Sequence, residues 1–165
     1  MNLEEELRYD NFKSRIVRNL LLRLKTEKEV RDKYSRYDDS DLYLERAIEE
    51  IKEYGYIDDE KYARLYIQDA IILEKRNSIF ELKQKLIQKG VSSNYIYNAI
   101  SENEEELNEL EQKVIKKILY NKRKKEEDKV ISYLYRKGFN TRNIQNAVAD
   151  YKYERDNVSN GRKKY

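Results

Sequence analysis

Three consecutive acids, Asp58-Asp59-Glu60, stand where one helical pattern ends and the next begins. Carboxylates this close together can ligate a divalent cation or take part in acid–base chemistry. Such a site needs companion groups, and the chain has no histidine, no cysteine and no phosphate-binding glycine loop. Acids at a helix start also accept hydrogen bonds from its free N–H groups. We therefore assign these acids to helix capping and predict no metal site, no cofactor and no enzyme activity.

The basic residues indicate a binding function more directly. The candidates are Arg15, Arg18, Arg23, the run Lys122-Arg123-Lys124-Lys125, and Arg136, Lys137 and Arg142. Such cations contact phosphates without reading sequence, and these contacts weaken with added salt. A solvated helix face explains Arg15 and Arg18 equally well, whereas the four-residue run favours binding. Tyr34, Tyr37, Tyr133 and Tyr135 lie near basic residues and could stack on bases, although buried helix stripes account for many tyrosines.

The net charge of +3 conceals a strong asymmetry along the chain. Residues 1–112 hold 19 Lys and Arg against 26 Asp and Glu, whereas residues 113–165 hold 16 against 6. The last third therefore carries a net charge of +10 and the rest −7. This polarity indicates that the last third meets a polyanion or an acidic protein surface, unless it is a solvated, lysine-rich end.

The composition favours an all-α protein. The 165 residues include no proline and four glycines, 39% are hydrophobic and 41% are charged. Sheet proteins need more turn residues than this, and the charge suits thin helical layers with long solvated faces. The N-terminus lacks the pattern of a signal peptide, and no apolar run is long enough to span a bilayer. We expect a cytoplasmic monomer without membrane contact.

The acids belong to a joint between two helical patterns. Gly55 suits the left-handed turn that closes a helix, and Asp58 or Asp59 can cap the next one. After the joint, apolar residues share one helix face, namely Tyr62, Ala63, Tyr66, Ala70 and Leu73. Gly55, Asp58, Asp59, Tyr62 and Ala63 are therefore the residues we assign to this joint.

The patterns on both sides of the joint repeat. The capping box Thr26-x-x-Glu29 recurs 52 residues later as Ser78-x-x-Glu81, and the apolar positions of the following helices keep the same offset. A third copy follows 48 residues further on, where Lys137-Gly138 matches Lys89-Gly90. Its cap is poorer, because Glu126 replaces the hydroxyl residue. Each copy is too small to bury a core alone, so neighbours must stack.

We predict an elongated, curved tandem array of three three-helix repeats. The first repeat with its N-terminal lead-in takes residues 1–57, the second residues 58–102 and the third residues 103–153. Residues 154–165 form a basic segment without period, which we expect to be disordered.

Several of these segments resemble the RecX family of bacterial RecA regulators. The stretch from Tyr54 to Ala63 resembles that family's glycine–aromatic–aliphatic–Asp-Asp joint, and Leu24 to Val30 resembles the entry to its second helix. The helix ends Lys89-Gly90-Val91 and Lys137-Gly138-Phe139 resemble its repeated Lys-Gly ends. The resemblance covers residues 11–152. The first repeat departs from it, with Tyr37-Asp38-Asp39 at the Lys-Gly position.

The resemblance implies regulation by binding. Members of the family bind the RecA filament on single-stranded DNA and limit its growth or promote its disassembly, which lowers RecA activity in recombination, DNA repair and the SOS response. The alternative is a helical module of helix-turn-helix type that binds nucleic acid directly, and a helical adaptor for another protein is a further one. Tight, salt-dependent binding to DNA alone would favour the direct module.

Overall fold

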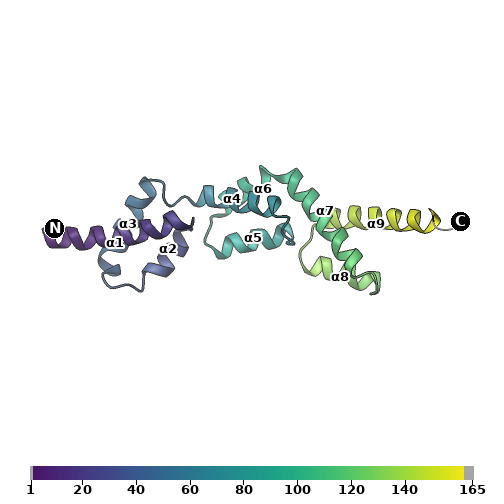
Figure 1. Ribbon diagram of the computed structural model, residues 1–165, viewed down its shortest axis with the longest axis horizontal. Coiled ribbons are helices and arrows are strands. Elements are labelled where there is room, and N and C mark those ends of the chain that lie inside the picture. Colours follow the sequence, from purple (N-terminus) through teal and green to yellow (C-terminus); the bar gives the residue numbers. More distant parts are fainter. Residues whose placement is uncertain (1, 162–165) are drawn as a thin grey trace. The chain divides into compact units, whose positions relative to one another are not determined.

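The computed structural model describes residues 2–161, and the side chains of residues 2–157. These residues form helices without any strand (Figure 1). In chain order the helices are α1 (Leu3–Leu22), α2 (Glu27–Tyr34), α3 (Ser40–Glu53), α4 (Asp59–Ile72), α5 (Ile79–Gln88), α6 (Ser93–Ser101), α7 (Glu104–Asn121), α8 (Glu127–Arg136) and α9 (Thr141–Gly161). They confirm an all-α fold made of three three-helix repeats. Among the described helices, none combines the length and the hydrophobicity that a bilayer span requires.

Contacts within the chain define two compact units. Unit 1 comprises Met1–Tyr66 and Leu86–Ala99, and unit 2 comprises Ile67–Lys85 and Ile100–Tyr165. The first repeat, α1 to α3, lies within unit 1, and the third repeat, α7 to α9, lies within unit 2. The helices of the second repeat contribute to both units.

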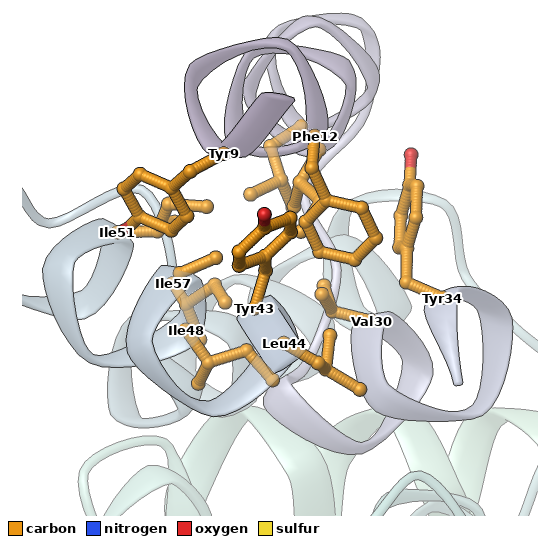
Figure 2. Packing of buried hydrophobic residues seen from close by; sticks show 12 residues of the cluster. Tyr9, Phe12, Val30, Tyr34, Tyr43, Leu44, Ile48, Ile51 and Ile57 are labelled. Carbon is orange, nitrogen blue, oxygen red and sulfur yellow. The ribbon is translucent and has the colours of Figure 1, made fainter. Parts of the chain in front are cut away.

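The first repeat has an aromatic core of its own (Figure 2). Tyr9 and Phe12 project from α1 toward Tyr43 of α3, with ring centroids 5.7 and 6.2 Å from that of Tyr43. Edge-on and tilted ring pairs of this kind stabilise a core beyond the area that they bury. Aliphatic residues of α2, α3 and the following loop complete the cluster, namely Val30, Leu44, Ile48, Ile51 and Ile57. Tyr34 is also buried, so it is not available for base stacking.

The third repeat has an aliphatic core. Helix α7 contributes Leu110, Val114, Ile115 and Leu119, which fall at helical spacing on one face. The other two helices add Val130, Leu134, Ile144 and Ala147, and Phe139 packs from the turn between them. This core holds the C-terminal end of α7 and the N-terminal end of α8, which flank the basic run 122–125.

The joint after α3 has the geometry that a glycine permits. Gly55 adopts φ 73°, and the N–H of Tyr56 donates to the carbonyl of Ile51, which closes the helix. Asp58 Oδ1 accepts from the N–H of Lys61 at 2.8 Å and so caps α4. Tyr62 and Ala63 are buried.

Two details differ from the sequence prediction. Leu73 is 67% exposed because α4 ends at Ile72, and Ile67 is buried on the inner face of that helix. Helix α9 also continues through residues 154–161, where we expected disorder. Ion pairs connect the start of this segment to the other two helices of the repeat: Glu154 pairs with Lys116 of α7 at 3.1 Å, and Arg155 with Glu127 of α8 at 3.6 Å. Residues 162–165 lie outside the described part of the chain.

Two junctions of the same design connect successive repeats. In the first junction, Thr26 caps α2 through its hydroxyl oxygen and donates the hydroxyl proton to the carbonyl of Lys89 at 2.6 Å. Glu29 closes the capping box and pairs with Lys89 Nζ at 2.6 Å. Asp59 Oδ1 accepts from the N–H of Glu27 at 2.9 Å. The free N–H groups in the first turn of α2 therefore have acceptors in the next repeat as well as in the capping box of the helix itself.

The second junction repeats these contacts in unit 2. Ser78 caps α5 and donates to the carbonyl of Lys137 at 2.8 Å, and Glu81 lies 3.6 Å from Lys137 Nζ. The N–H of Ile79 donates to Glu111 Oε1 at 2.8 Å. Thr26 and Ser78 are both fully buried, because the Lys-Gly turn of the following repeat covers them.

Alanine substitutions at the turn glycines should separate backbone strain from packing. Gly55 and Gly138 both have positive φ, but a Cβ at Gly55 meets open space, whereas one at Gly138 lies 2.6 Å from Phe80 Cδ1. Gly55→Ala should cost about 1 kcal/mol, the penalty of the left-handed region. Gly138→Ala should cost about 1 kcal/mol more, because Phe80 is half exposed and can shift. Urea unfolding of both variants measures the difference, and equal losses would contradict this packing.

Candidate functional site

A basic turn connects α7 and α8 in the third repeat. Lys122 is the C-cap residue of α7, and its Nζ lies 3.5 Å above the ring centroid of Tyr133. The Arg123 guanidinium lies 4.5 Å from the ring centroid of Tyr120 and donates to the carbonyl of that residue at 3.0 Å. Lys124 and Lys125 are exposed. The aromatic rings therefore hold two cations in place while the other two extend into solvent.

A cleft of about 700 Å³ adjoins this turn on the side of α9. Its lining residues are Lys116, Lys117, Tyr120, Asn121, Arg123, Tyr151, Glu154 and Arg155. A smaller cavity of about 150 Å³ shares Arg123 and Tyr151 with the cleft and reaches Lys122 and Lys125. Of the four cations that line the larger space, Lys116, Lys117 and Arg155 form ion pairs with acids, so the positive charge that it offers to a ligand comes mainly from Arg123.

The other cations of the third repeat flank α8. Arg136 belongs to the last turn of this helix and lines a shallow hollow with Ser132. Lys137 is part of the second junction, where its side chain faces Glu81. Arg142 lies in the first turn of α9, with an exposed side chain. Arg136 and Arg142 are therefore available to a partner, whereas Lys137 has a structural role.

The N-terminal cations belong to α1 in unit 1. Arg15 lies over the ring of Tyr37 at 5.3 Å, and Arg18 Nε donates to the carbonyl of Ser14 at 3.3 Å. Arg23 follows the last residue of α1 and is exposed. Arg15 and Arg18 are both exposed, so this group forms a solvated basic face.

Carboxylate partners distinguish these candidates from the other cations of the chain. Among the basic residues that the sequence analysis proposes for binding, Lys137 alone has a carboxylate of residues 2–157 within 4.0 Å of its charged group. By contrast, Arg8, Lys13, Arg31 and Lys52 all form ion pairs of 2.9 Å or less. The positive charge of the turn 122–125 is therefore not neutralised by the fold.

The three acids at the joint have separate structural roles. Asp58 caps α4, Asp59 binds the N–H of Glu27, and Glu60 pairs with Arg64 at 3.1 Å. Burial raises the pKa of Asp59, while the N–H of Glu27 counters part of that rise. Among residues 2–157 no three acids converge on a point where a metal ion could bind.

Sequence reasoning missed a buried acid, Glu111. Its side chain is 1% exposed and accepts hydrogen bonds from the N–H groups of Ile79 and Asn140 and from Asn143 Nδ2, at 2.8, 3.1 and 2.6 Å. Glu111 lies on the apolar face of α7, four residues after Leu107 and three before Val114. That position was the available signal, because an acid on a buried stripe needs donors from neighbouring elements.

Acid should destabilise the first repeat. The hydrogen bond from Lys13 lowers the pKa of Glu50, and bonds from Lys52 and Arg31 outweigh burial and lower that of Glu27. A lowered folded-state pKa contributes stability above the ordinary value of about 4.5, and that stability is lost as the pH falls through the folded value. Asp59, with its raised pKa, acts in the opposite sense.

We therefore expect the melting temperature to be nearly constant from about pH 7 to 5.5 and to fall below about pH 4.5. Circular dichroism melts of the unaltered chain and of Glu50→Gln test this. The variant should lose less stability on acidification, and an identical acid slope in both proteins would contradict the role of Glu50.

Comparison with known proteins identifies relatives along most of the chain. The chain is 35% identical over 148 residues to "Regulatory protein RecX" of Clostridium perfringens (strain SM101), which covers 84% of this chain and 68% of that protein. It is 31% identical over 143 residues to the protein of the same name from Streptococcus sanguinis, covering 84% and 54%. These alignments thus span about half to two thirds of the relatives' length. No protein-family model matches the chain.

Two solved structures share the fold. A crystal structure of RecX from Lactobacillus salivarius superimposes with a TM-score of 0.75 at 20% identity, over 88% of this chain and 97% of that one. A crystal structure of a regulatory protein RecX gives 0.77 at 24% identity, over 86% and 73%. Together with the sequence relatives, they show that this chain belongs to the RecX family of regulatory proteins.

Proposed function

We propose that this chain regulates the recombinase RecA by binding the RecA filament on single-stranded DNA, mainly as an inhibitor. The identity with RecX regulatory proteins along 148 residues carries the proposal. A bound regulator would restrain RecA in recombination, DNA repair and the SOS response.

The basic turn 122–125 is the surface that we assign to this contact. Its four cations have no acid partner among residues 2–157, so binding a partner does not require breaking an ion pair. A nucleoprotein filament carries phosphates and acidic side chains, and both attract such a surface at long range. Arg136 and Arg142 add two exposed cations from the same repeat.

The test is a titration of RecA with this chain. The DNA-dependent ATPase rate of RecA and the length of its filaments should both fall at less than one chain per RecA protomer. Electron microscopy measures filament length in the same mixtures. If folded protein leaves both quantities unchanged, the proposal is wrong.

Direct binding of nucleic acid is a second candidate function, favoured by the cleft beside the turn. Tyr120 is 58% exposed and lines the cleft beside Arg123, so a base has an aromatic surface next to a cation. This function predicts tight binding of a labelled oligonucleotide in the absence of RecA, with a steep fall in affinity as salt rises. Binding that is weak unless RecA is present would favour the filament regulator.

A further inference from the structure

Acids of α9 neutralise a lysine in the cleft beside the basic turn. Lys116 lines this cleft, and its Nζ lies 3.1 Å from a carboxylate oxygen of Asp150 and 3.1 Å from one of Glu154. Burial lowers the pKa of Lys116, but the bonds to these two acids outweigh burial and raise that pKa. A phosphate that approaches Lys116 therefore also meets the negative charge of Glu154, which lines the cleft itself.

A second lysine of the cleft is neutralised by Glu74, which follows α4. Lys117 Nζ lies 3.0 Å from one carboxylate oxygen of Glu74, and Lys113 pairs with the other oxygen. Hydrogen bonds from Lys113 and Lys117 lower the pKa of Glu74, so this carboxylate is charged at neutral pH. Glu74 has φ 45°, a left-handed backbone that favours glycine. What the acid adds at this strained position is its two ion pairs with α7.

The basic turn 122–125 has no such acids. None of its four cations has a carboxylate of residues 2–157 within 4.0 Å, and only Arg123 also lines the cleft. Sites for single-stranded nucleic acid combine aromatic side chains that stack on bases with cations that follow the backbone. Tyr120 and Tyr151 give the cleft the aromatic part of such a site. The cations that would follow the backbone are occupied by acids of the chain itself.

We propose that Glu74, Asp150 and Glu154 determine the specificity of this surface, because they prevent the cleft from binding free single-stranded nucleic acid. The phosphates of a free strand are repelled by the three acids, whereas a protein partner can bind the turn 122–125 without entering the cleft. Exposed ion pairs contribute little to stability, so their main effect here is on the charge of the surface. The inference rests on the proposed function, since it concerns how a filament regulator avoids free strands.

Removing the three carboxylates with little change in side-chain shape tests the proposal. The cleft variant carries Glu74→Gln, Asp150→Asn and Glu154→Gln, and the probe is a labelled oligothymidylate in the absence of RecA. The variant should bind this probe at least about tenfold more tightly than the unaltered chain does at about 50 mM salt. Two freed lysines, Lys116 and Lys117, should each add a phosphate contact. The slope of log affinity against log salt should therefore steepen by about 1.4, or about 0.7 for each lysine. Fluorescence anisotropy measures both quantities.

A control variant carries the same change in net charge outside the cleft. It replaces three exposed acids, namely Glu49→Gln, Glu53→Gln and Glu109→Gln. Its affinity should rise by less than about threefold and its salt slope should not change, because it adds no phosphate contact. Equal gains in both variants overturn the proposal. So does a dissociation constant below about 1 μM for the unaltered chain at about 150 mM salt, because the acids would then not exclude a free strand.

Circular dichroism shows whether the cleft variant is folded. If it loses helix, a variant with Glu74→Gly and Glu154→Gln replaces it, since glycine suits the left-handed backbone at residue 74. This variant frees Lys117 fully, so its salt slope should steepen by about 0.7. A folded variant that gains neither affinity nor slope overturns the proposal. These measurements contain no RecA, whereas the proposed function is tested by the RecA titration, so the two proposals can fail separately.

Discussion

Replacing Glu111 with alanine should lower the free energy of unfolding by about 3–5 kcal/mol, the cost of removing one partner from a buried, charged hydrogen-bond network. Three donors would lose their acceptor, namely the N–H groups of Ile79 and Asn140 and the amide of Asn143. For a chain of this size the melting temperature should fall by about 10 °C. Urea unfolding followed by circular dichroism measures both quantities.

Two further variants separate the acceptor role of Glu111 from general effects of the helix. Glu111→Gln keeps one acceptor oxygen, so it should lose clearly less stability than the alanine variant. Glu109→Ala removes an exposed acid two residues away and should change the stability by about 0.5 kcal/mol or less. If Glu111→Ala resembles Glu109→Ala, the buried network does not hold the second junction together.

Reversing the four charges of the basic turn should weaken RecA inhibition at least about tenfold while leaving the fold intact. The variant carries Lys122→Glu, Arg123→Glu, Lys124→Glu and Lys125→Glu, and its concentration for half-maximal inhibition of the RecA ATPase is the measurement. The loss follows from repulsion between the new acids and an anionic filament surface. Stability should fall by only about 1–2 kcal/mol, from the lost cation–π contact with Tyr133 and from acids at the end of α7.

A variant with the same change in net charge serves as the control. It reverses cations that are exposed and lie outside the proposed surface, namely Arg36, Lys61, Arg76 and Lys83. This control should inhibit RecA nearly as well as the unaltered chain. Equal losses in both variants would indicate a dependence on net charge alone, and full inhibition by the turn variant would make the turn a solvated face.

The sequence predicted features that depend on neighbouring residues. The capping boxes at Thr26 and Ser78 form as expected, because each needs a hydroxyl residue and a glutamate three positions apart. The poorer cap at Glu126 was also predicted. Repetition of these signals at fixed offsets was enough to identify three repeats.

Contacts between distant residues could not be predicted in this way. Capping chemistry predicted that the Thr26 hydroxyl would accept a hydrogen bond from its own helix, but its second bond goes to Lys89, 63 residues away. Asp58 or Asp59 was expected to cap α4, and Asp58 does so, but the bond from Asp59 to the N–H of Glu27 in the preceding repeat was not predicted. The basic turn was located from sequence alone, whereas its lack of acid partners depends on where every carboxylate lies.

The junctions also have a consequence for the order in which the chain folds. Their hydroxyl-to-carbonyl bonds close chain segments of 63 and 59 residues, whereas each helix forms through contacts between near neighbours. Closing long loops costs conformational entropy before any contact rewards it, so the junctions should form after the helices of single repeats. The chain contains no proline, which removes prolyl isomerisation as a source of slow kinetics. Closure of the two junctions is therefore the step that should limit the folding rate.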